Sequence, residues 1–222
     1  MTTRHVATRD ERTSFSAALK AATWSDHEAA ESSPFMDALL GGDVTPEGYA
    51  ALLAQQLYAY RIIEDAAATM ADDPVAGRFV FDELTRVPAL EADLAAILGD
   101  GWRERISPSA ATEAYCERLS EVCTTWAGGF VAHHYTRYMG DLSGGQFIGR
   151  VVRRALGIDE HRGAAFYHFE HIPDLKAFKD EYRDRLDAAP WDAQERDRII
   201  EEIRLAYRHN TAVLASLEPV PG

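Results

Sequence analysis

Apolar residues recur three or four positions apart along almost the whole of this 222-residue chain, which is the spacing of an amphipathic helix. The strict alternation of apolar and polar residues that marks a half-buried strand is hard to find anywhere in it. The pattern therefore predicts an all-α fold. Because there is no internal repeat and no long linker, the chain is expected to form a single domain over residues 1–222, with a helical core over about 12–217.

Helix boundaries follow from capping residues, prolines and glycines. Ser33-Pro34 and Thr45-Pro46 each combine a hydroxyl cap with a proline at the first helical position, and Asp72-Asp73-Pro74 breaks a helix. The pattern of the segment 158–173, rich in aromatic residues, fits a loop or short strand-like structure, and a packed aromatic loop is predicted. The predicted helices are Arg12–Ala30, Pro34–Gly41, Pro46–Met70, Ala76–Leu84, Leu90–Leu98, Pro108–Trp126, Gly129–Leu156, Asp174–Leu186 and Ala193–Leu217.

Charge, hydropathy and cysteine content limit the classes of function. The chain has 23 Lys and Arg against 36 Asp and Glu, a net charge of −13, whereas nucleic-acid binding needs clustered positive charge. Residues 1–14 contain no apolar stretch typical of a secretory signal, and no long apolar run predicts a membrane span. Cys116 and Cys123 lie too far apart on one predicted helix for a disulfide. We expect a cytoplasmic protein that binds neither nucleic acid nor membrane.

An unusual cluster of glycines, Gly140, Gly144, Gly145 and Gly149, lies inside the predicted helix over 129–156. Each interior glycine costs about 1 kcal/mol relative to alanine, so the cluster costs roughly 4 kcal/mol of helix stability. Gly140 and Gly144 are four positions apart and clear one stripe of the helix, on which a flat molecule can rest against the backbone. Close packing of helices, or a Gly-Gly turn between two helices, explains the same spacing.

Histidines are the other candidate ligands. His27 lies on the first predicted helix, with Glu31 four residues later and within reach of its second ring nitrogen. A neutral, oriented imidazole is what haem iron accepts as an axial ligand, although the same spacing is that of an ordinary surface pair. His133 and His134 point about 100° apart on a helix and are predicted to be structural.

The motifs together resemble the haem oxygenase family. The run 131–146 is similar to the distal-helix signature of that family, and the further matches, in family order from about Ser14 to Leu217, are His27-x-x-x-Glu31, Ser33-x-Phe35-Met36, Gln56-Leu-Tyr58, Phe178-Lys-Asp-Glu-Tyr-Arg183 and Asn210. The resemblance, to the bacterial branch in particular, implies haem (iron protoporphyrin IX) bound between a proximal and a kinked distal helix. It further implies cleavage of haem at a meso carbon by O₂ and electrons, through a ferric hydroperoxide, to biliverdin, CO and Fe²⁺, with iron acquisition as the expected purpose.

The same resemblance implies individual roles. His27 is the expected axial ligand of the haem iron and Glu31 its hydrogen-bond partner, while Gly140 and Gly144 are expected to contact the haem face. Asp141 matches the carboxylate that anchors the proton-delivering water network. The polar residues implied around it are Tyr58, Arg86, Tyr115, Arg137 and Asn210. The other implied haem contacts are Met36 and, for the propionates, Lys20, Tyr135, Lys179 and Arg183. The chain departs from some relatives at Trp24 and Leu214.

Electrons are expected from outside, because the sequence contains no flavin, nicotinamide or iron–sulfur motif. The implied donor is a ferredoxin with its reductase, or a flavin reductase. A basic docking patch for it is predicted to comprise Arg150, Arg153, Arg154, Lys179 and Arg185. Two other classes stay open at this point: a haem carrier or sensor without turnover, and a helical interaction protein without a cofactor.

Overall fold

The computed structural model describes residues 14–31 and 33–217 of the chain. Within this part no strand forms; Asp159 makes only isolated bridges to Arg162 and Gly163, so the all-α prediction is confirmed. The α-helices are α1 (Phe15–Ala22), α2 (Trp24–Glu31), α3 (Pro34–Gly41), α4 (Pro46–Met70), α5 (Val87–Leu98), α6 (Ala110–Val122), α7 (Ala127–Gly140), α8 (Gln146–Leu156), α9 (Leu175–Ala188) and α10 (Ala193–Ala215). The shorter elements are 3₁₀ turns at Ala76–Phe79, Asp82–Leu84, Trp102–Arg105 and Ala165–Tyr167, and a π-helical turn at Asp141–Gly145.

Several helix starts and stops lie where the sequence chemistry predicts them, whereas α5 begins at Val87 and not at Leu90, and α6 spans Ala110–Val122 behind a Ser109 cap and not Pro108–Trp126. Ser33 accepts a hydrogen bond from the Met36 amide at 3.1 Å and Thr45 one from the Gly48 amide at 3.1 Å, each directly before a proline at the start of a helix. α8 ends at Gly157, whose φ of 64° is the left-handed conformation that glycine adopts at little cost. The predicted bounds of the helix over 46–70 are confirmed.

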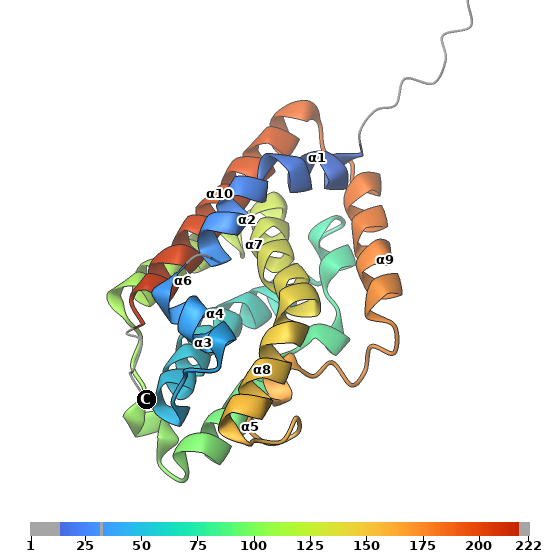
Figure 1. The fold of residues 1–222 in the computed structure, drawn as a ribbon. Coiled ribbons are helices and arrows are strands. Elements are labelled where there is room, and N and C mark those ends of the chain that lie inside the picture. Colours follow the sequence, from blue (N-terminus) through green and yellow to red (C-terminus); the bar gives the residue numbers. More distant parts are fainter. Residues whose placement is uncertain (1–13, 32, 218–222) are drawn as a thin grey trace, which may run out of the picture.

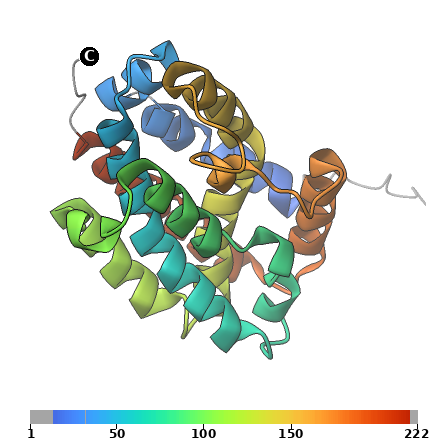
Figure 2. The same ribbon diagram turned by 90° about the horizontal axis from the view of Figure 1, so that it is seen from below.

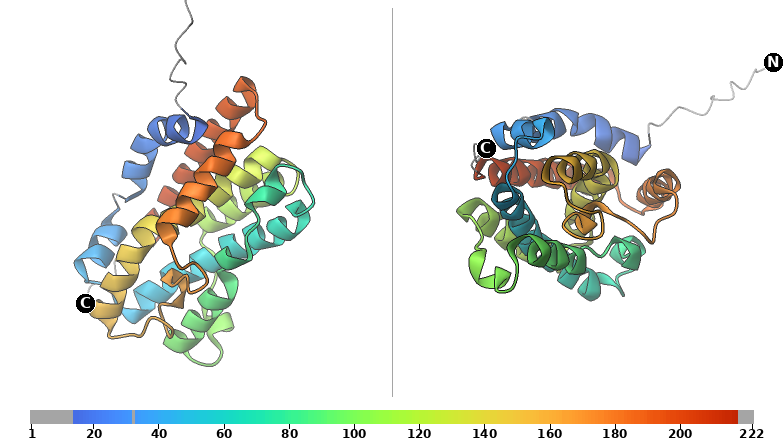
Figure 3. Two further views of the ribbon diagram at one scale, coloured as in Figure 1. Left: turned by 90° about the vertical axis from the view of Figure 1, so that its right-hand side faces the viewer. Right: turned by 60° about the horizontal axis from the view of Figure 1, so that its bottom comes forward.

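The arrangement places two walls on either side of one space. α1 to α3 follow α10 along one side of the molecule, and α7 and α8 run one after the other across it (Figure 1). α4 contacts α5, α6 and α7, and the view from below shows α4, α5 and α6 lying side by side (Figure 2). The right-hand view in Figure 3 shows α9 standing apart at the edge of the molecule, and α9 contacts α1. α2 and the α7–α8 junction thus face each other over the interior.

The core contains an unusual number of tyrosines. Tyr49, Tyr60, Tyr115, Tyr138 and Tyr182 are all among the largest fully buried side chains. Burial raises the pKa of each of these phenols. They therefore stay protonated and available as hydrogen-bond donors inside the helical bundle.

Three predicted helices are each divided in the structure. The predicted helix over 76–84 is wrong: this segment forms the two 3₁₀ turns Ala76–Phe79 and Asp82–Leu84, separated by the extended residues Val80 and Phe81. The predicted helix over 12–30 is broken at Thr23, whose hydroxyl donates to the Leu19 carbonyl at 2.9 Å, so α2 begins a new direction at Trp24; residues 12 and 13 lie outside the described part. The predicted helix over 129–156 is interrupted by the π-helical turn 141–145. A π-helical turn contains an extra residue and bends a helix, which agrees with the implied kink.

The loop over 158–173 is packed with aromatic side chains, as predicted. Phe166, Tyr167 and Phe169 are 1%, 6% and 5% exposed, respectively. In the described part of the chain no helix is both long and apolar enough to cross a membrane. Cys116 and Cys123 are free thiols.

Candidate functional site

A cavity of about 360 Å³ opens between α2 and the α7–α8 junction. Its walls come from α1 to α4, the α7–α8 junction and α10, with further residues from the aromatic loop and α9. Most of the sequence-predicted site residues line it. These are Lys20, His27, Met36, Tyr135, Arg137, Gly140, Asp141, Gly144, Arg183 and Asn210, together with Trp24 and Leu214, the two departures from the pattern.

His27 faces the cavity from α2, between two aromatic rings. The indole of Trp24 stacks on its imidazole, with ring centroids 5.4 Å apart and planes within 8°. Tyr207 from α10 meets the same imidazole edge-on, with centroids 5.8 Å apart. The break at Thr23 gives α2 its own direction, so the stacked pair is presented to the cavity. The side chain of Glu31 lies outside the described residues, and its contact with His27 stays a prediction.

The opposite wall is the π-helical turn. A Cβ added at Gly140 would meet no atom of the protein within 4 Å, so bare backbone faces open space there. Gly144 also lines the cavity. Glycine is present at positions 145 and 149 for a different reason, because Tyr167 packs against both. A Cβ added at Gly145 would lie 3.4 Å from the Tyr167 side chain, and one added at Gly149 would lie 2.8 Å from it. The glycine cluster thus combines an open cavity face with close helix packing, which was one of the alternatives.

Asp141, the first residue of the turn, is the cavity's acidic group. Burial raises its pKa to about 6, although a hydrogen bond from Tyr60 and the positive charges of Arg137 and Arg86 act to lower it. A carboxyl group with a pKa near neutrality can both hold and release a proton at physiological pH.

Tyr58, predicted to belong to the polar residues around Asp141, does not line the cavity. On a helix, the side chains of residues two positions apart are separated by about 200° around the helix axis. Tyr58 and Tyr60 of α4 therefore point in different directions. Burial raises the pKa of the Tyr58 phenol, and the groups whose charge acts on it are Arg61, on the same helix, and Cys116, on α6. Tyr60 is the tyrosine that contacts Asp141.

Arg137 connects the turn to α10 and to the buried tyrosines. Its Nη1 donates to the Asn210 side-chain carbonyl at 3.0 Å. Its guanidinium lies over the rings of Tyr60 and Tyr115, at 5.1 and 5.4 Å from their centroids. Tyr115 therefore supports Arg137 from behind and does not itself line the cavity.

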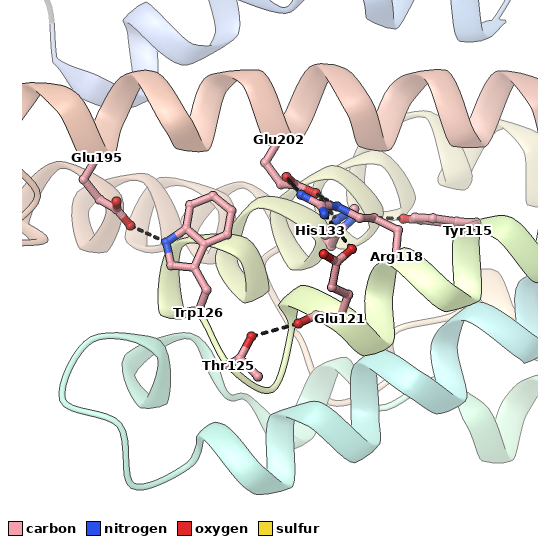
Figure 4. A network of polar contacts seen from close by, with 8 residues as sticks. All are labelled: Tyr115, Arg118, Glu121, Thr125, Trp126, His133, Glu195 and Glu202. Atoms are coloured by element: carbon pink, nitrogen blue, oxygen red, sulfur yellow. Dashed lines mark hydrogen bonds and ion pairs between the residues drawn. The ribbon is translucent and has the colours of Figure 1, made fainter.

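Behind Tyr115, a buried polar cluster joins α6, α7 and α10 (Figure 4). Glu202 accepts from Arg118 through Nε at 2.9 Å and Nη2 at 2.5 Å, and from His133 at 2.9 Å. Although burial by itself raises the pKa of Glu202, the bonds from His133 and Arg118 lower it to about 2. His134 pairs instead with the Tyr182 hydroxyl at 2.9 Å. Both adjacent histidines thus have structural partners, and no group of three or more potential metal ligands occurs in the described residues.

The aromatic loop is held in place by two buried charges. Asp93, on α5, accepts hydrogen bonds from the amides of Gly163, Ala165 and Phe166 at 2.8–2.9 Å. Arg86 donates to the His168 carbonyl at 2.8 Å, and its guanidinium lies 4.2 Å from the centre of the Phe169 ring. Arg86 therefore acts on Asp141 only through its charge, while it and Asp93 fix the loop that carries Phe166 and Tyr167 to the cavity.

The basic residues lie at the cavity edge and beyond it. Lys20 lines the cavity, with its ammonium 5.8 Å from the Trp24 ring, and Arg183 lines it from α9. Lys179 is not part of the lining, because its ammonium donates to the Leu142 carbonyl and the Ser143 hydroxyl at 3.2 and 3.1 Å. It ties α9 to the π-helical turn.

Only some of the basic residues predicted to form the docking patch are exposed without an ion-pair partner among the described residues. Arg150 and Arg154 are exposed on α8 and have no ion-pair partner among the described residues, whereas Arg153 pairs with Glu160 at 2.5 Å. Phe147 is 50% exposed beside them, with the Arg150 guanidinium 5.8 Å from its ring centre. On α9, Arg185 donates to the carbonyl of Arg78 and to Glu181.

Sequence reasoning gave no role to several cavity residues: Leu52, Gln56, Phe166, Tyr167 and Tyr207. For Gln56 a signal existed, since it lies four positions before Tyr60 on one flank of the same helix. The aromatic loop offered no periodic pattern from which its direction could be read.

The residues present fit haem. An imidazole faces bare glycine backbone across an apolar cavity, and two cations, Lys20 and Arg183, reach the same space. Haem needs an axial nitrogen ligand, a flat space for the ring and positive charge for its two propionates. The lining provides each of them.

Comparisons with known proteins point the same way. The family model described as "Heme oxygenase" matches residues 13–216. The chain is 37% identical over 200 residues to heme oxygenase 1 of Nostoc sp., covering 90% of this chain and 84% of the relative. It is 38% identical over 205 residues to heme oxygenase 1 of Pongo abelii, covering 91% and 71% of the two chains.

A solved structure agrees closely in fold. The crystal structure of heme oxygenase-1 from the cyanobacterium Synechocystis sp. in complex with heme superposes with a TM-score of 0.88 at 35% identity, covering 92% of each chain. The structure of heme oxygenase from Leptospira interrogans superposes with a TM-score of 0.87 at 34% identity, covering 92% of this chain and all of that one.

Proposed function

The chain belongs to the haem oxygenase family, and from this premise we propose how its cavity carries out the family's reaction. It is a haem oxygenase, an enzyme that uses O₂ and electrons to open haem at a meso carbon and release biliverdin, CO and Fe²⁺. Haem is both its substrate and the group that activates oxygen. The observation that carries the residue assignment is the pairing of His27 with the bare Gly140 backbone across one cavity.

His27 is the proposed axial ligand of the haem iron. Its imidazole is held between the face of Trp24 and the edge of Tyr207, which limits the rotation of the ring. Glu31, four residues later, is the proposed acceptor for the other ring nitrogen. On the opposite side, Gly140 and Gly144 let the backbone approach the haem face, since no Cβ intervenes.

Asp141 is the proposed proton carrier of the distal side. Tyr60 and the charge of Arg137 stabilise its ionised form, and burial favours its protonated form, which together give a pKa of about 6. The carboxyl group can therefore take up a proton and pass it on, through water, at the cavity surface. Asn210 fixes the Arg137 guanidinium that lies beside it.

The basic residues at the edge are proposed to orient the haem. Lys20 and Arg183 bind the propionates, and Tyr135 and Met36 contact the ring edge and face. Lys179 contributes by holding α9 against the π-helical turn. Because the propionates fix the rotation of the ring in the cavity, they determine which meso carbon is attacked, and the alpha position is the expected one.

The enzyme requires an external redox partner. We propose a ferredoxin with its reductase, or a flavin reductase, docking on the exposed basic face of α8. Arg150 and Arg154 present positive charge around Phe147 on a chain whose net charge is −13, which favours an acidic carrier. A cytoplasmic location and a role in iron acquisition remain part of the proposal.

The docking face is tested by reversing its charge. The double variant Arg150→Glu, Arg154→Glu is expected to slow turnover with the protein donor and to reduce the salt dependence of the rate. Turnover with ascorbate should be unaffected. Arg103→Glu, on a side chain that is 62% exposed elsewhere, is the matched control. Equal rates and equal salt dependence in both variants would rule the face out.

The enzyme activity and its site are tested by adding hemin to the purified protein under air. With ascorbate or a ferredoxin and its reductase as donor, the Soret band should decay while biliverdin and CO appear. A stable spectrum under competent reduction would instead indicate a haem carrier or sensor. Failure to bind hemin would contradict the site assignment altogether.

A further inference from the structure

His27 lies in the first turn of α2, directly after a break between two helices. α1 ends at Ala22, the break is at Thr23, and α2 begins at Trp24. The last carbonyls of a helix have no hydrogen-bond partner within that helix. Contacts made at the break therefore determine the direction that α2 takes, and with it the position of His27.

Arg204, on α10, binds the backbone at this break. Its Nη2 and Nε donate to the Ala22 carbonyl at 3.0 and 3.3 Å. Because Ala22 is the last residue of α1, the guanidinium supplies a partner that the helix itself lacks and places a positive charge at the negative end of the helix dipole. The two residues are 182 positions apart in the chain, so this contact fastens the start of α2 to α10.

The same guanidinium also lies near the residue that precedes His27. The Nε of Arg204 is 3.8 Å from the Oδ2 of Asp26, and the two side chains are 35% and 24% exposed. An ion pair that is this long and this accessible to solvent contributes little to stability. The two donations to the Ala22 carbonyl therefore provide most of the tie between α10 and the start of α2.

Tyr207, three residues further along α10, contacts the imidazole of His27. Residues three positions apart lie on the same face of a helix, so Arg204 and Tyr207 face α2 together. The Tyr207 ring meets the His27 ring edge-on, with centroids 5.8 Å apart. α2 contacts α10, alongside which it lies in Figure 1. One face of α10 thus holds both the start of α2 and the ring of His27.

We propose that Arg204 is a positioning residue for His27. By fixing the direction of α2 at the break, it keeps the imidazole between Trp24 and Tyr207, where the ring faces the cavity. Neither the resemblance nor the sequence pattern gave Arg204 a role. This role rests on the proposed function of His27 as axial ligand, whereas the tie itself is present without haem.

Hydrogen exchange in the ligand-free protein tests the tie. Arg204→Met removes the donors at similar side-chain length, Arg204→Lys keeps a charge and a donor, and Arg208→Met, at an exposed position on the same helix, is the matched control. The His27 amide donates to the Thr23 carbonyl at 3.0 Å and so reports on the start of α2. Its exchange should be about fivefold faster in Arg204→Met, as expected for the loss of one hydrogen bond, less accelerated in Arg204→Lys, and at the parent rate in Arg208→Met.

The iron–imidazole stretching band in the resonance Raman spectrum of the ferrous haem complex tests the positioning role. The band should be shifted or broadened in Arg204→Met and unchanged in Arg208→Met. Equal exchange rates in these two variants would overturn the tie, and faster exchange with an unchanged band would overturn the positioning role. If the band persists in His27→Ala, the axial assignment fails, while faster exchange in Arg204→Met still establishes the tie.

Discussion

Tyr60 of α4 donates its phenol hydrogen to the Oδ2 of Asp141, the first residue of the π-helical turn. The two residues are 81 positions apart in the chain, so this bond fastens the turn to the central helix. Among the described residues that line the cavity, Asp141 has the only carboxylate. The bond therefore holds in place the acidic group on which the proposed chemistry depends, and it opposes the rise in the pKa of Asp141 that burial causes.

Replacing Tyr60 with phenylalanine should raise the pKa of Asp141 above about 6, because the hydrogen bond that favours the ionised carboxylate is lost. The acid-side midpoint of the pH–rate profile should move upward by roughly one pH unit. Tyr58→Phe is the matched control, since Tyr58 does not line the cavity. Identical profiles for the two variants would contradict the role given to Tyr60.

The glycines of the cluster should respond in opposite ways to alanine. Gly140→Ala adds a Cβ that meets no protein atom, so the ligand-free protein should gain about 1 kcal/mol of stability while haem binding weakens. Gly149→Ala places a Cβ 2.8 Å from that of Tyr167 and should lower the melting temperature. Thermal unfolding and hemin titration of both variants test this. Parent haem affinity in Gly140→Ala would exclude a haem contact there.

His27→Ala should bind haem at least about tenfold more weakly, a loss of roughly 1.4 kcal/mol, and should lose turnover. Added imidazole should restore the spectrum and part of the activity, because it can fill the ligand position. His171→Ala, on a side chain that is 69% exposed, is the control. Parent activity of His27→Ala without imidazole would refute the axial assignment.

Glu202→Gln should lower the free energy of unfolding by about 3 kcal/mol at pH 7, because Arg118 and the buried His133 would lose the carboxylate to which they donate. The pKa of Glu202 is lowered from 4.5 to about 2 in the folded protein, so its contribution is complete above pH 4.5 and declines as the pH falls toward 2. The difference between variant and parent should shrink over that window in urea unfolding. Glu121→Gln, in an exposed pair with Arg118, should cost less than about 0.5 kcal/mol.

Asp93→Asn should destabilise the aromatic loop. One of the three amide donors, that of Phe166, would then face an NH₂ group instead of an oxygen, at a cost of about 2–4 kcal/mol. Faster hydrogen exchange at the Phe166 amide and a lower melting temperature are the expected results. The exposed Asp159, which accepts from the His161 amide at 2.8 Å, provides the control Asp159→Asn, and an equal effect of both would contradict a special role of Asp93.

Local signals predicted most of the helices. Caps such as Ser33 and Thr45 and the terminating Gly157 have short-range chemistry, so the sequence alone places them. The break at Thr23 was not predictable in the same way, because no glycine or proline marks it and the hydroxyl that bonds the Leu19 carbonyl is equally common inside helices.

The site was only partly accessible from sequence. The glycine cluster indicated a cavity wall because a helix rarely contains so many glycines without a reason, and His27 was found through the resemblance. Tyr58 was chosen where Tyr60 is the contact, because the two lie on one helix and only the packing of α4 against α7 decides which of them faces Asp141.

The π-helical turn makes the segment 141–145 sensitive to the insertion or deletion of a single residue. Loss of one codon within 141–145 would leave a continuous helix, yet it would rotate everything after it by about 100°. Gly149 and Val152, now buried, would turn away from the core, and the exposed Phe147 would turn out of its present position. An in-frame deletion there should therefore be more damaging than most substitutions, although it makes the helix more regular.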